Sequence, residues 1–306
     1  FNPDGSMVYG PVTSEQNTDE DGLFLTDLIP GDKITILLSE PTNTKENSKF
    51  VISRVVHGYK NLFPSEDGSM LKAAALSCHN DINCYPNWDM ESKAVALVLL
   101  SNGTAMCSGA LINNTENNGE PFFLTAFHCI DTSSPFGTLS SAEKTAAQNW
   151  AFRFRYKKTT CNGSAVSSYI TYNRASLLAA WANTDFALMK LMNATAVKTP
   201  NFSFLGWDRS GSTATSGASI HHPAGDPMKI SFDNHSMPSH PSNIDWRDAN
   251  GYIITTSPAN THWSVGFDNG TAEGGSSGSP LLNQSKKVIG QLHGGMSGCA
   301  PVTKYY

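Results

Sequence analysis

The chain has 306 residues, of which 39% are hydrophobic and 15% charged, and its formal net charge is −5. This length predicts two or three domains with a sizeable core, and the charge excludes a basic nucleic-acid-binding surface and an acidic tail. No apolar run approaches the length of a membrane-spanning helix, since the run 94–100 is only as long as a strand. The chain begins with Phe1 and no signal-peptide pattern precedes it, so we expect a processed product or a fragment.

Residues 1–70 contain no cysteine, and their pattern predicts a small β domain. Two short β-branched runs, 33–38 and 50–57, are separated by the polar loop 40–47. We therefore expect a strand, a turn and a strand in this part of the chain. Residues 61–70 combine proline, aspartate and glycine, which indicates a linker to whatever follows.

From Cys78 onward, short apolar runs follow one another at close spacing, separated by polar, glycine-rich turns. We predict a helix over residues 141–149, with Ser141 as its cap and Glu143 in its first turn. Many short strands with such turns are typical of all-β barrels and sandwiches. The predicted strands cover residues 93–101, 109–113, 121–126, 151–156, 186–192, 218–222, 280–282 and 288–292.

The chain has six cysteines and none of the paired Cys-x-x-Cys spacing of a zinc site. An even number of cysteines, in a chain poor in charge and rich in Asn, Ser, Thr and Gly, predicts an exported protein with three disulfides. The alternative is a cytosolic protein with six reduced thiols. Several Asn-x-Ser/Thr sequons are present, among them Asn102, Asn193 and Asn269, and they would be glycosylated only in a host that performs this reaction.

Histidine, aspartate and serine occur in that chain order, each in a distinctive setting. His128 ends an apolar run, Asp185 precedes another, and Ser277 lies in a glycine-rich turn. A serine hydroxyl is a poor nucleophile unless an imidazole takes its proton and a carboxylate fixes the tautomer of that imidazole. Each residue alone would more often be structural, but the three settings together predict a catalytic triad. The same turn would let the amides of Gly275 and Ser277 form an oxyanion hole.

The motifs around these residues resemble the trypsin/chymotrypsin family and, more narrowly, the bacterial lysyl endopeptidases. The wider resemblance rests on Cys-Ser-Gly-Ala-Leu-Ile (107–112), Thr-Ala-Phe-His-Cys (125–129), Asp-Phe-Ala-Leu (185–188) and Gly-Ser-Ser-Gly-Ser-Pro (275–280). The narrower one rests on Ser-Cys-His-Asn-Asp-Ile-Asn-Cys (77–84), Leu-Ile-Asn-Asn-Thr (111–115), Ile-His-His-Pro (220–223) and Gly-Gln-Leu-His-Gly-Gly (290–295).

This resemblance implies two antiparallel six-stranded β-barrels over residues 73–306, with the active site between them, preceded by an amino-terminal pro-region over residues 1–70. It implies that His128 is the general base, Asp185 the orienting acid and Ser277 the nucleophile. His293 would lie beside the specificity pocket, and the backbone of Gly294 and Gly295 would pair with the substrate as an added strand. The disulfides implied by the resemblance are Cys78–Cys299, Cys84–Cys161 and Cys107–Cys129.

The chain departs from the family pattern in two ways that concern specificity. If Tyr306 matches the family's tyrosine near the pocket, Lys304 stands where lysyl endopeptidases have the aspartate that binds the substrate lysine. A cation there would repel lysine and favour an acidic or neutral side chain; alternatively, the loop differs in length and Lys304 is exposed. A second feature favours lysine specificity instead. Lys72 lies just before Ala73, where the mature protease would begin, and self-cleavage there would fit a lysine-specific enzyme.

Two further departures concern activation and completeness. Ser276 occupies the place where trypsin-like zymogens often have an aspartate, so activation through an ion pair at that place is not available. We expect residues 1–70, if they inhibit, to cover the cleft or to aid folding. The family's fold needs one more strand and a helix beyond Tyr306, so we expect the protease domain to be truncated.

The leading prediction is a secreted, monomeric serine endopeptidase that acts on peptide substrates and needs no cofactor or metal. One alternative is a protease fold that has lost activity and serves as a binding module. A second is a metal-dependent hydrolase, although its candidate ligands lack helical metal-binding spacing. Those candidates are His221, His222, His235 and His240.

Overall fold

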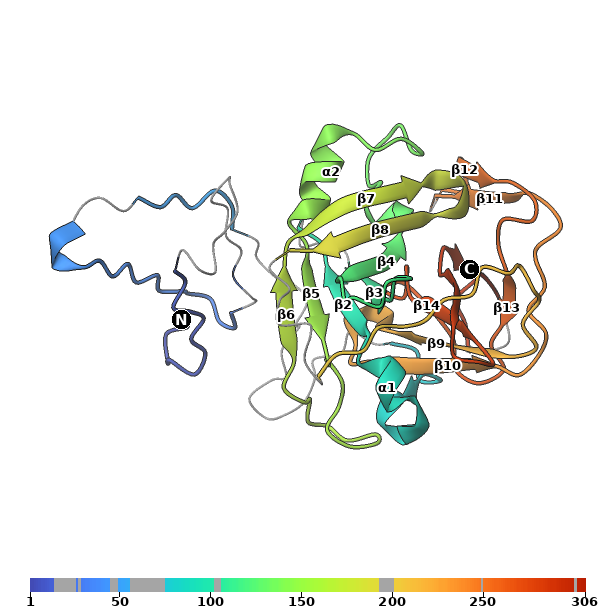
Figure 1. The fold of residues 1–306 in the computed structure, drawn as a ribbon, viewed down its shortest axis with the longest axis horizontal. Helices are drawn as coiled ribbons and strands as arrows, with labels where there is room; N and C mark the ends of the chain where they lie inside the picture. The colour runs from blue at the N-terminus through green and yellow to red at the C-terminus, as the bar shows by residue number, and fades with distance from the viewer. Residues whose placement is uncertain are drawn as a thin grey trace.

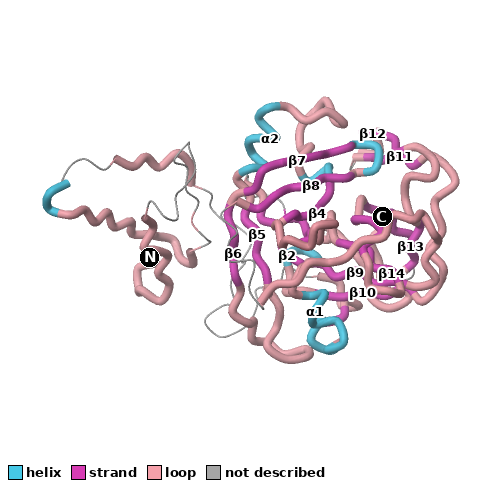
Figure 2. Tube along the Cα trace, in the orientation of Figure 1, coloured by secondary structure: helices cyan, strands magenta, loops and turns pink. Residues whose placement is uncertain are grey.

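The computed structural model of the chain describes residues 1–13, 26, 29–44, 49–55, 75–101, 106–192, 201–248, 250–299 and 302–306. From residue 75 onward the described chain consists mainly of strands with few helices, so the all-β prediction is confirmed (Figure 1). Figure 2 shows the strands gathered in one body, with most of the loops around its outside. No helix among the described residues is long and apolar enough to cross a membrane.

The first half of this body, residues 75–192, is built on a seven-stranded antiparallel sheet. Val95–Leu99 forms a central strand whose side chains are buried almost throughout, whereas buried and half-buried positions alternate along Phe186–Leu191. Aromatic rings fill the interior, where the ring centroids of Phe123 and Phe152 lie 4.9 Å apart. The strands, in sheet order, are β6 (Ile170–Asn173), β5 (Ala151–Phe154), β2 (Val95–Leu99), β3 (Met106–Ile112), β4 (Phe122–Ala126), β8 (Phe186–Leu191) and β7 (Ala175–Trp181).

The second half is divided among three smaller sheets. The five-stranded sheet has the order β1 (Asn80–Asp81), β10 (Lys229–Asp233), β9 (Gly217–His221), β14 (Pro280–Asn283) and β15 (Val288–Gln291). The three-stranded sheet has the order β13 (Ser264–Gly266), β17 (Thr303–Tyr305) and β16 (Gly294–Gly295), and the two-stranded sheet pairs β11 (Ile244–Arg247) with β12 (Ile253–Ser257). The hydrogen-bonded sheets therefore do not divide into six strands per half, because the first half has seven strands in one sheet and the strands of the second half are divided among three sheets.

All eight predicted strands between residues 93 and 292 are present, with ends that differ by at most three residues. The predicted helix is α2 (Ser141–Gln148), but its cap is Ser140 rather than Ser141. The Ser140 hydroxyl accepts the amide of Glu143, and the Glu143 carboxylate accepts the amide of Ser140, which is a capping box. The other helical segments are short: α1 (Asp89–Ser92) and 3₁₀ turns at Thr42–Thr44, Ile82–Cys84, Pro86–Trp88, Phe127–Cys129, Ala182–Thr184 and Pro223–Gly225.

Three disulfides connect the pairs that the resemblance implied, namely Cys78–Cys299, Cys84–Cys161 and Cys107–Cys129. The first joins positions 221 residues apart and ties the segment before β1 to the segment between β16 and β17. The third joins β3 to the turn after β4. Cross-links across such long stretches restrict the unfolded chain and so stabilise the fold.

The amino-terminal part of the chain differs from the prediction. Residues 33–38 and 50–55 are extended but form no strand, and residues 56–57 lie outside the described range. The apolar side chains of these runs are exposed, with Leu37 at 78% and Val51 at 86%. In Figure 1 the described residues of this segment lie to one side of the body, and they pair with none of its described strands. The expected strands are therefore wrong for the described residues, while the division at residues 70 to 73 stays a prediction.

Candidate active site

His128 and Asp185 are brought together by two neighbouring strands of the first sheet. β4 ends at Ala126 and β8 begins at Phe186, and these two residues are partners in the antiparallel pair. His128 Nδ1 lies 2.8 Å from Asp185 Oδ2, and the His128 amide donates to Asp185 Oδ1 at 2.8 Å. Asp185 is buried, whereas the His128 side chain is 37% exposed, so one face of the imidazole is open to a substrate.

The charge of Asp185 controls the protonation of His128. Burial alone would lower the pKa of His128, but the charge and the hydrogen bond of Asp185 outweigh it and raise the pKa above its ordinary value of 6.5. Asp185 adopts a left-handed backbone conformation with φ of 53°, which asparagine and aspartate tolerate better than other residues with a side chain. This conformation turns both carboxylate oxygens back toward the amide and ring of His128.

Ser277 lies in a tight turn that packs against the end of β4. A Cβ on Gly278 would lie 2.7 Å from the amide nitrogen of Ala126, so only glycine permits this approach. The turn is braced from the first half by Ser108, whose amide donates to the Ser277 carbonyl at 2.8 Å. The Ser108 hydroxyl also donates to the Gly275 carbonyl at 2.8 Å and accepts the amide of His222. Ser277 is thereby held beside the strand that leads to His128.

The amides of Gly275 and Ser277 are free within the described part of the chain, whereas those of Ser276 and Gly278 donate to backbone carbonyls. Gly275 has φ of +93°, and a Cβ there would lie 2.8 Å from the His222 carbonyl oxygen. This conformation favours glycine strongly. Two free donors on either side of Ser276 are the arrangement that an oxyanion hole requires.

Ser276 has a structural role in this turn. Its hydroxyl is buried, lies 2.7 Å from His221 Nδ1 and accepts the amide of Glu273. Burial holds the pKa of His221 well below its ordinary value, so its ring is neutral. The Glu273 carboxylate in turn accepts the amide of Leu76 at 2.9 Å and lies 2.8 Å from His79 Nε2. The segment before β1 is therefore fastened to the turn that carries Ser277.

His293 lies against the pair of His128 and Asp185. Its ring is stacked on that of His128 at 5.6 Å and on Trp246 at 3.5 Å, and its Nδ1 lies 3.0 Å from His262 Nε2. Burial lowers the pKa of His293 far below 6.5 and that of His262 to about 4, so both rings are neutral and add no charge beside His128. The sequence does not mark Trp246 or His262 as part of the site, because Trp246 lies on a short strand and His262 in an irregular loop. Both contact His293 rather than His128.

Lys304 is buried at 2% exposure on β17, opposite Gly295 of β16. A Cβ on Gly295 would lie 2.8 Å from Lys304 Cα, and the Lys304 ammonium donates to the Met296 carbonyl oxygen. Burial lowers the pKa of Lys304 to about 8, and the Glu273 carboxylate partly offsets this. The expectation of an exposed Lys304 is therefore wrong. β16 is the edge of its sheet, and the pairing of Gly294 and Gly295 with a substrate strand stays a prediction.

The four histidines of the metal alternative are not brought together. The ring nitrogens of His221 face Ser276 and Ser231, and His222 Nδ1 faces the Asp226 carbonyl. Among the described residues, two other groups have three potential metal-binding atoms within 4.8 Å of one another. These are His128, Asp185 and His293, and Asp233, His235 and Asp268.

A family model described as the C-terminal domain of lysyl endopeptidase matches residues 73–306 of the chain. A lysyl endopeptidase from Pseudomonas aeruginosa is 28% identical over 304 residues, which cover 92% of this chain and 58% of that protein. The secreted RxLR effector protein 73 of Plasmopara viticola is 25% identical, over 95% of this chain and 68% of that protein. The chain thus spans less than two thirds of the length of the P. aeruginosa relative.

Among solved structures, the active form of the Rv3671c protease from M. tuberculosis has a TM-score of 0.44 and 13% sequence identity. The alignment covers 76% of this chain and 86% of that one.

Proposed function

The chain belongs to the lysyl endopeptidase family, and we propose that it is a serine endopeptidase whose nucleophile is Ser277. The observation that carries this proposal is the hydrogen-bonded pair of His128 and Asp185 beside a turn that offers two free amides next to Ser277. These are the parts that acyl transfer requires: a base, its orienting acid, a nucleophile and donors for the oxyanion.

In the proposed reaction, His128 Nε2 takes the hydroxyl proton of Ser277 as its Oγ attacks the scissile carbonyl carbon. The amides of Gly275 and Ser277 donate to the carbonyl oxygen as it becomes negative. The amide C–N bond then breaks, the leaving amine takes the proton from His128, and an acyl-enzyme remains on Ser277. Water, activated by His128, attacks this ester and releases the acid product with the free serine.

Asp185 supports the cationic stage of this cycle. It holds the proton on His128 Nδ1, which leaves Nε2 as the acceptor, and its charge stabilises the imidazolium. His293, stacked on His128 but neutral, packs the ring in this orientation without repelling its positive charge.

We propose that the enzyme prefers an acidic or neutral side chain at the cleavage site over lysine. The support is the buried ammonium of Lys304 beside Gly295, on the strand next to the one expected to bind substrate. A desolvated cation repels a substrate lysine strongly and pairs with a carboxylate. Lys72, directly before Ala73, would favour lysine instead, so a cleavage profile on a peptide library decides between the two.

We propose further that the protein is secreted and that residues 1–70 act as a pro-region. Three disulfides support an oxidising compartment, and the P. viticola relative bears the word secreted in its name. The apolar side chains exposed near Leu37 and Val51 are suited to cover another surface before removal. We expect the chain beginning at Ala73 to be more active than the full chain, and equal activities would contradict an inhibitory role.

The central test is labelling with a fluorophosphonate, which reacts with activated serines. We expect the wild-type chain to be labelled and Ser277→Ala to be unlabelled, with kcat lowered by about a million-fold. Ser279→Ala, two residues away, is a control for the turn. A folded wild-type chain that is not labelled would contradict the proposal and favour the binding module, and activity lost to a chelator would favour a metal enzyme.

A further inference from the structure

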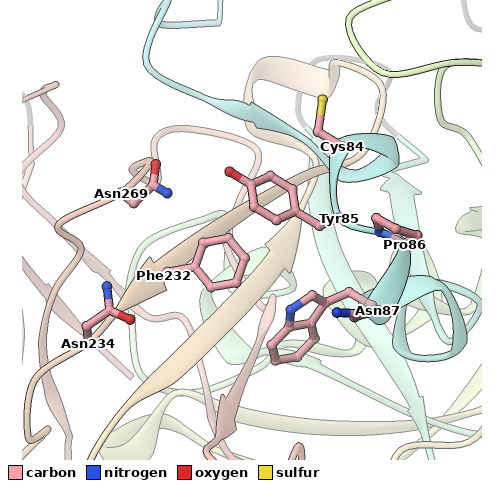
Figure 3. Close-up of a pocket in the computed structure, with 8 residues that line it drawn as sticks. Cys84, Tyr85, Pro86, Asn87, Phe232, Asn234 and Asn269 are labelled. Atoms are coloured by element: carbon pink, nitrogen blue, oxygen red, sulfur yellow. The ribbon is translucent and has the colours of Figure 1, made fainter.

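A pocket with a volume of about 340 Å³ is lined by none of the proposed catalytic residues. It lies between the segment after β1 and the end of β10 (Figure 3). Aromatic rings form its inner wall and asparagine side chains stand around it. The lining residues are Cys84, Tyr85, Pro86, Asn87, Trp88, Phe232, Asn234 and Asn269.

The aromatic wall consists of three rings in contact with one another. The rings of Tyr85 and Phe232 lie 4.9 Å apart, and those of Trp88 and Phe232 lie 5.9 Å apart. The disulfide of Cys84 to Cys161 holds one side, and Phe232 belongs to β10 on the other. The three rings are only partly buried, so their faces remain accessible. Apolar ring faces bordered by amide donors and acceptors suit a sugar, which presents apolar C–H groups and hydroxyls together.

Two asparagines of this pocket begin glycosylation sequons. Asn269 begins Asn-Gly-Thr (269–271), and Asn234 begins Asn-His-Ser (234–236). Both side chains are exposed, as a bulky attached group requires. The pocket therefore combines an acceptor for a glycan with a surface suited to its first sugar.

Asn269 is the better acceptor of the two. Its backbone pairs with that of Phe232, the two residues exchanging hydrogen bonds at 2.8 and 3.3 Å. Such partners have Cα atoms about 5.5 Å apart, which places the Asn269 side chain at the edge of the aromatic wall. Its Oδ1 accepts Asn80 Nδ2 at 2.9 Å, and its own Nδ2 has no partner among the described residues. Asn234 Nδ2, in contrast, donates to Asp268 at 3.0 Å.

We propose that Asn269 carries an N-linked glycan and that the first sugar of this glycan packs against Tyr85 and Phe232. In Figure 3 the hydroxyl end of Tyr85 is turned toward the side where Asn269 lies. The donor is a lipid-diphosphate-linked oligosaccharide, used by the host's oligosaccharyltransferase. Asn269 Nδ2 bonds to the anomeric carbon, the carbon–oxygen bond to the diphosphate breaks, and the diphosphate leaves with the electron pair while Nδ2 loses one proton.

Occupancy is tested by secreting the full chain from yeast with an Asn-Gly-Thr tag at its end as a positive control. Peptide mass spectrometry after PNGase F in heavy-oxygen water marks each modified asparagine as labelled aspartate. We expect Asn269 to be marked in most molecules, also in Thr271→Ser, and never in Thr271→Val. Because the buried Thr271 hydroxyl has no partner among the described residues, the valine variant loses no hydrogen bond. An unmarked Asn269 beside a marked tag would overturn the proposal.

The contact with the aromatic wall is tested by trimming. Endoglycosidase H leaves the first sugar on Asn269, whereas PNGase F removes the whole glycan. We expect the protein trimmed with endoglycosidase H to keep the Tm of the intact glycoprotein. The protein treated with PNGase F and the variant Thr271→Val should both melt about 2–4 °C lower, a shift typical of one lost contact in a domain of this size. Tyr85→Ala should abolish the difference between the two products, and Tyr252→Ala, at a tyrosine outside the pocket that is 73% exposed, should keep it.

Equal Tm values for both products of the wild-type chain would show that the sugar does not occupy the pocket. Unglycosylated protein from bacteria is also titrated with diacetylchitobiose. Saturable binding, together with an unmodified Asn269 in yeast, would replace the proposal by a site for a free saccharide.

Discussion

The two halves of the protease domain position their functional residues by different means. His128 follows β4 and Asp185 precedes β8. These two strands are direct neighbours in the seven-stranded sheet, so strand register alone brings the two residues together. Ser277 and Lys304 lie on a turn and on a three-residue strand, in a half divided among small sheets. Their positions depend on single contacts from elsewhere, such as the hydrogen bonds of Ser108.

This difference suggests a division of labour. Under the proposed function, the first half supplies proton transfer, which every substrate needs, on a scaffold with little freedom. The second half would supply the nucleophile and the oxyanion donors on one turn, and substrate recognition on short elements whose side chains can change without disturbing the large sheet. Substitutions in the first half should therefore slow all substrates alike, and substitutions at Lys304 should change which substrates are cleaved.

The largest effect in this comparison is expected for Asp185→Asn. Asparagine tolerates the left-handed backbone at this position, so the fold should be kept while the His128 tautomer and the imidazolium lose their partner. We expect kcat to fall by about 10,000-fold, by the same factor for acidic and neutral substrates. Steady-state kinetics measures this, with Asp208→Asn, outside the site, as the control. A loss that depends on the substrate would contradict the division.

A smaller effect is expected for Gly275→Ala in the second half. The added Cβ would meet the carbonyl of His222 at 2.8 Å in a backbone conformation that alanine avoids, so the Gly275 amide must move. We expect kcat to fall by about 100- to 1,000-fold, as for the loss of one oxyanion donor. The neighbouring Gly274→Ala has open space and serves as the matched control. If both variants keep wild-type kcat, the Gly275 amide does not bind the oxyanion.

The sequence predicts most of the site in the first half because its signals are local there. His128 follows an apolar run and Asp185 precedes another, and each run is long enough to be recognised as a strand. Cys107 and Cys129 mark the strands on the His128 side. The family motifs add predictions for Ser277 and for the three disulfides. Roles for these residues stay predictions until the variants are measured.

The rest of the fold and site could not be predicted because it depends on contacts between distant segments. Trp246 lies on β11, which pairs with β12, and its ring stacks on that of His293, 47 positions later in the chain. No local sequence pattern predicts this contact. The short strands β13, β16 and β17 have two or three residues each, which is below the length at which alternation is visible. At residues 33–38 the sequence predicted a strand that the structure does not have, because a β-branched run without a partner strand forms no strand.

A more moderate effect is expected for Lys304→Met, which keeps the length of the side chain but removes its charge. A hydrogen bond to a charged group is worth about 1.5–3 kcal/mol, so preference for acidic over neutral substrates should fall by about 10- to 150-fold. Cleavage of neutral substrates should change little. The comparison of kcat/KM across a peptide series measures this, with Lys287→Met, at an exposed lysine, as control. An unchanged preference would show that Lys304 does not contact the substrate side chain.

The smallest effects are expected in the pH dependence, and they separate the two halves most directly. His128 must be neutral to accept a proton, and Asp185 raises its pKa, so kcat/KM for every substrate should fall as the pH decreases through a value above 6.5. Lys304 is charged below its pKa of about 8 and neutral above it. For acidic substrates alone, kcat/KM should therefore also fall as the pH rises through about 8, because the attracting charge is lost. This second decrease should be absent with neutral substrates and in Lys304→Met, whereas the first should persist in both. A basic decrease shared by all substrates would assign it to the catalytic groups, and recognition would then not depend on the charge of Lys304.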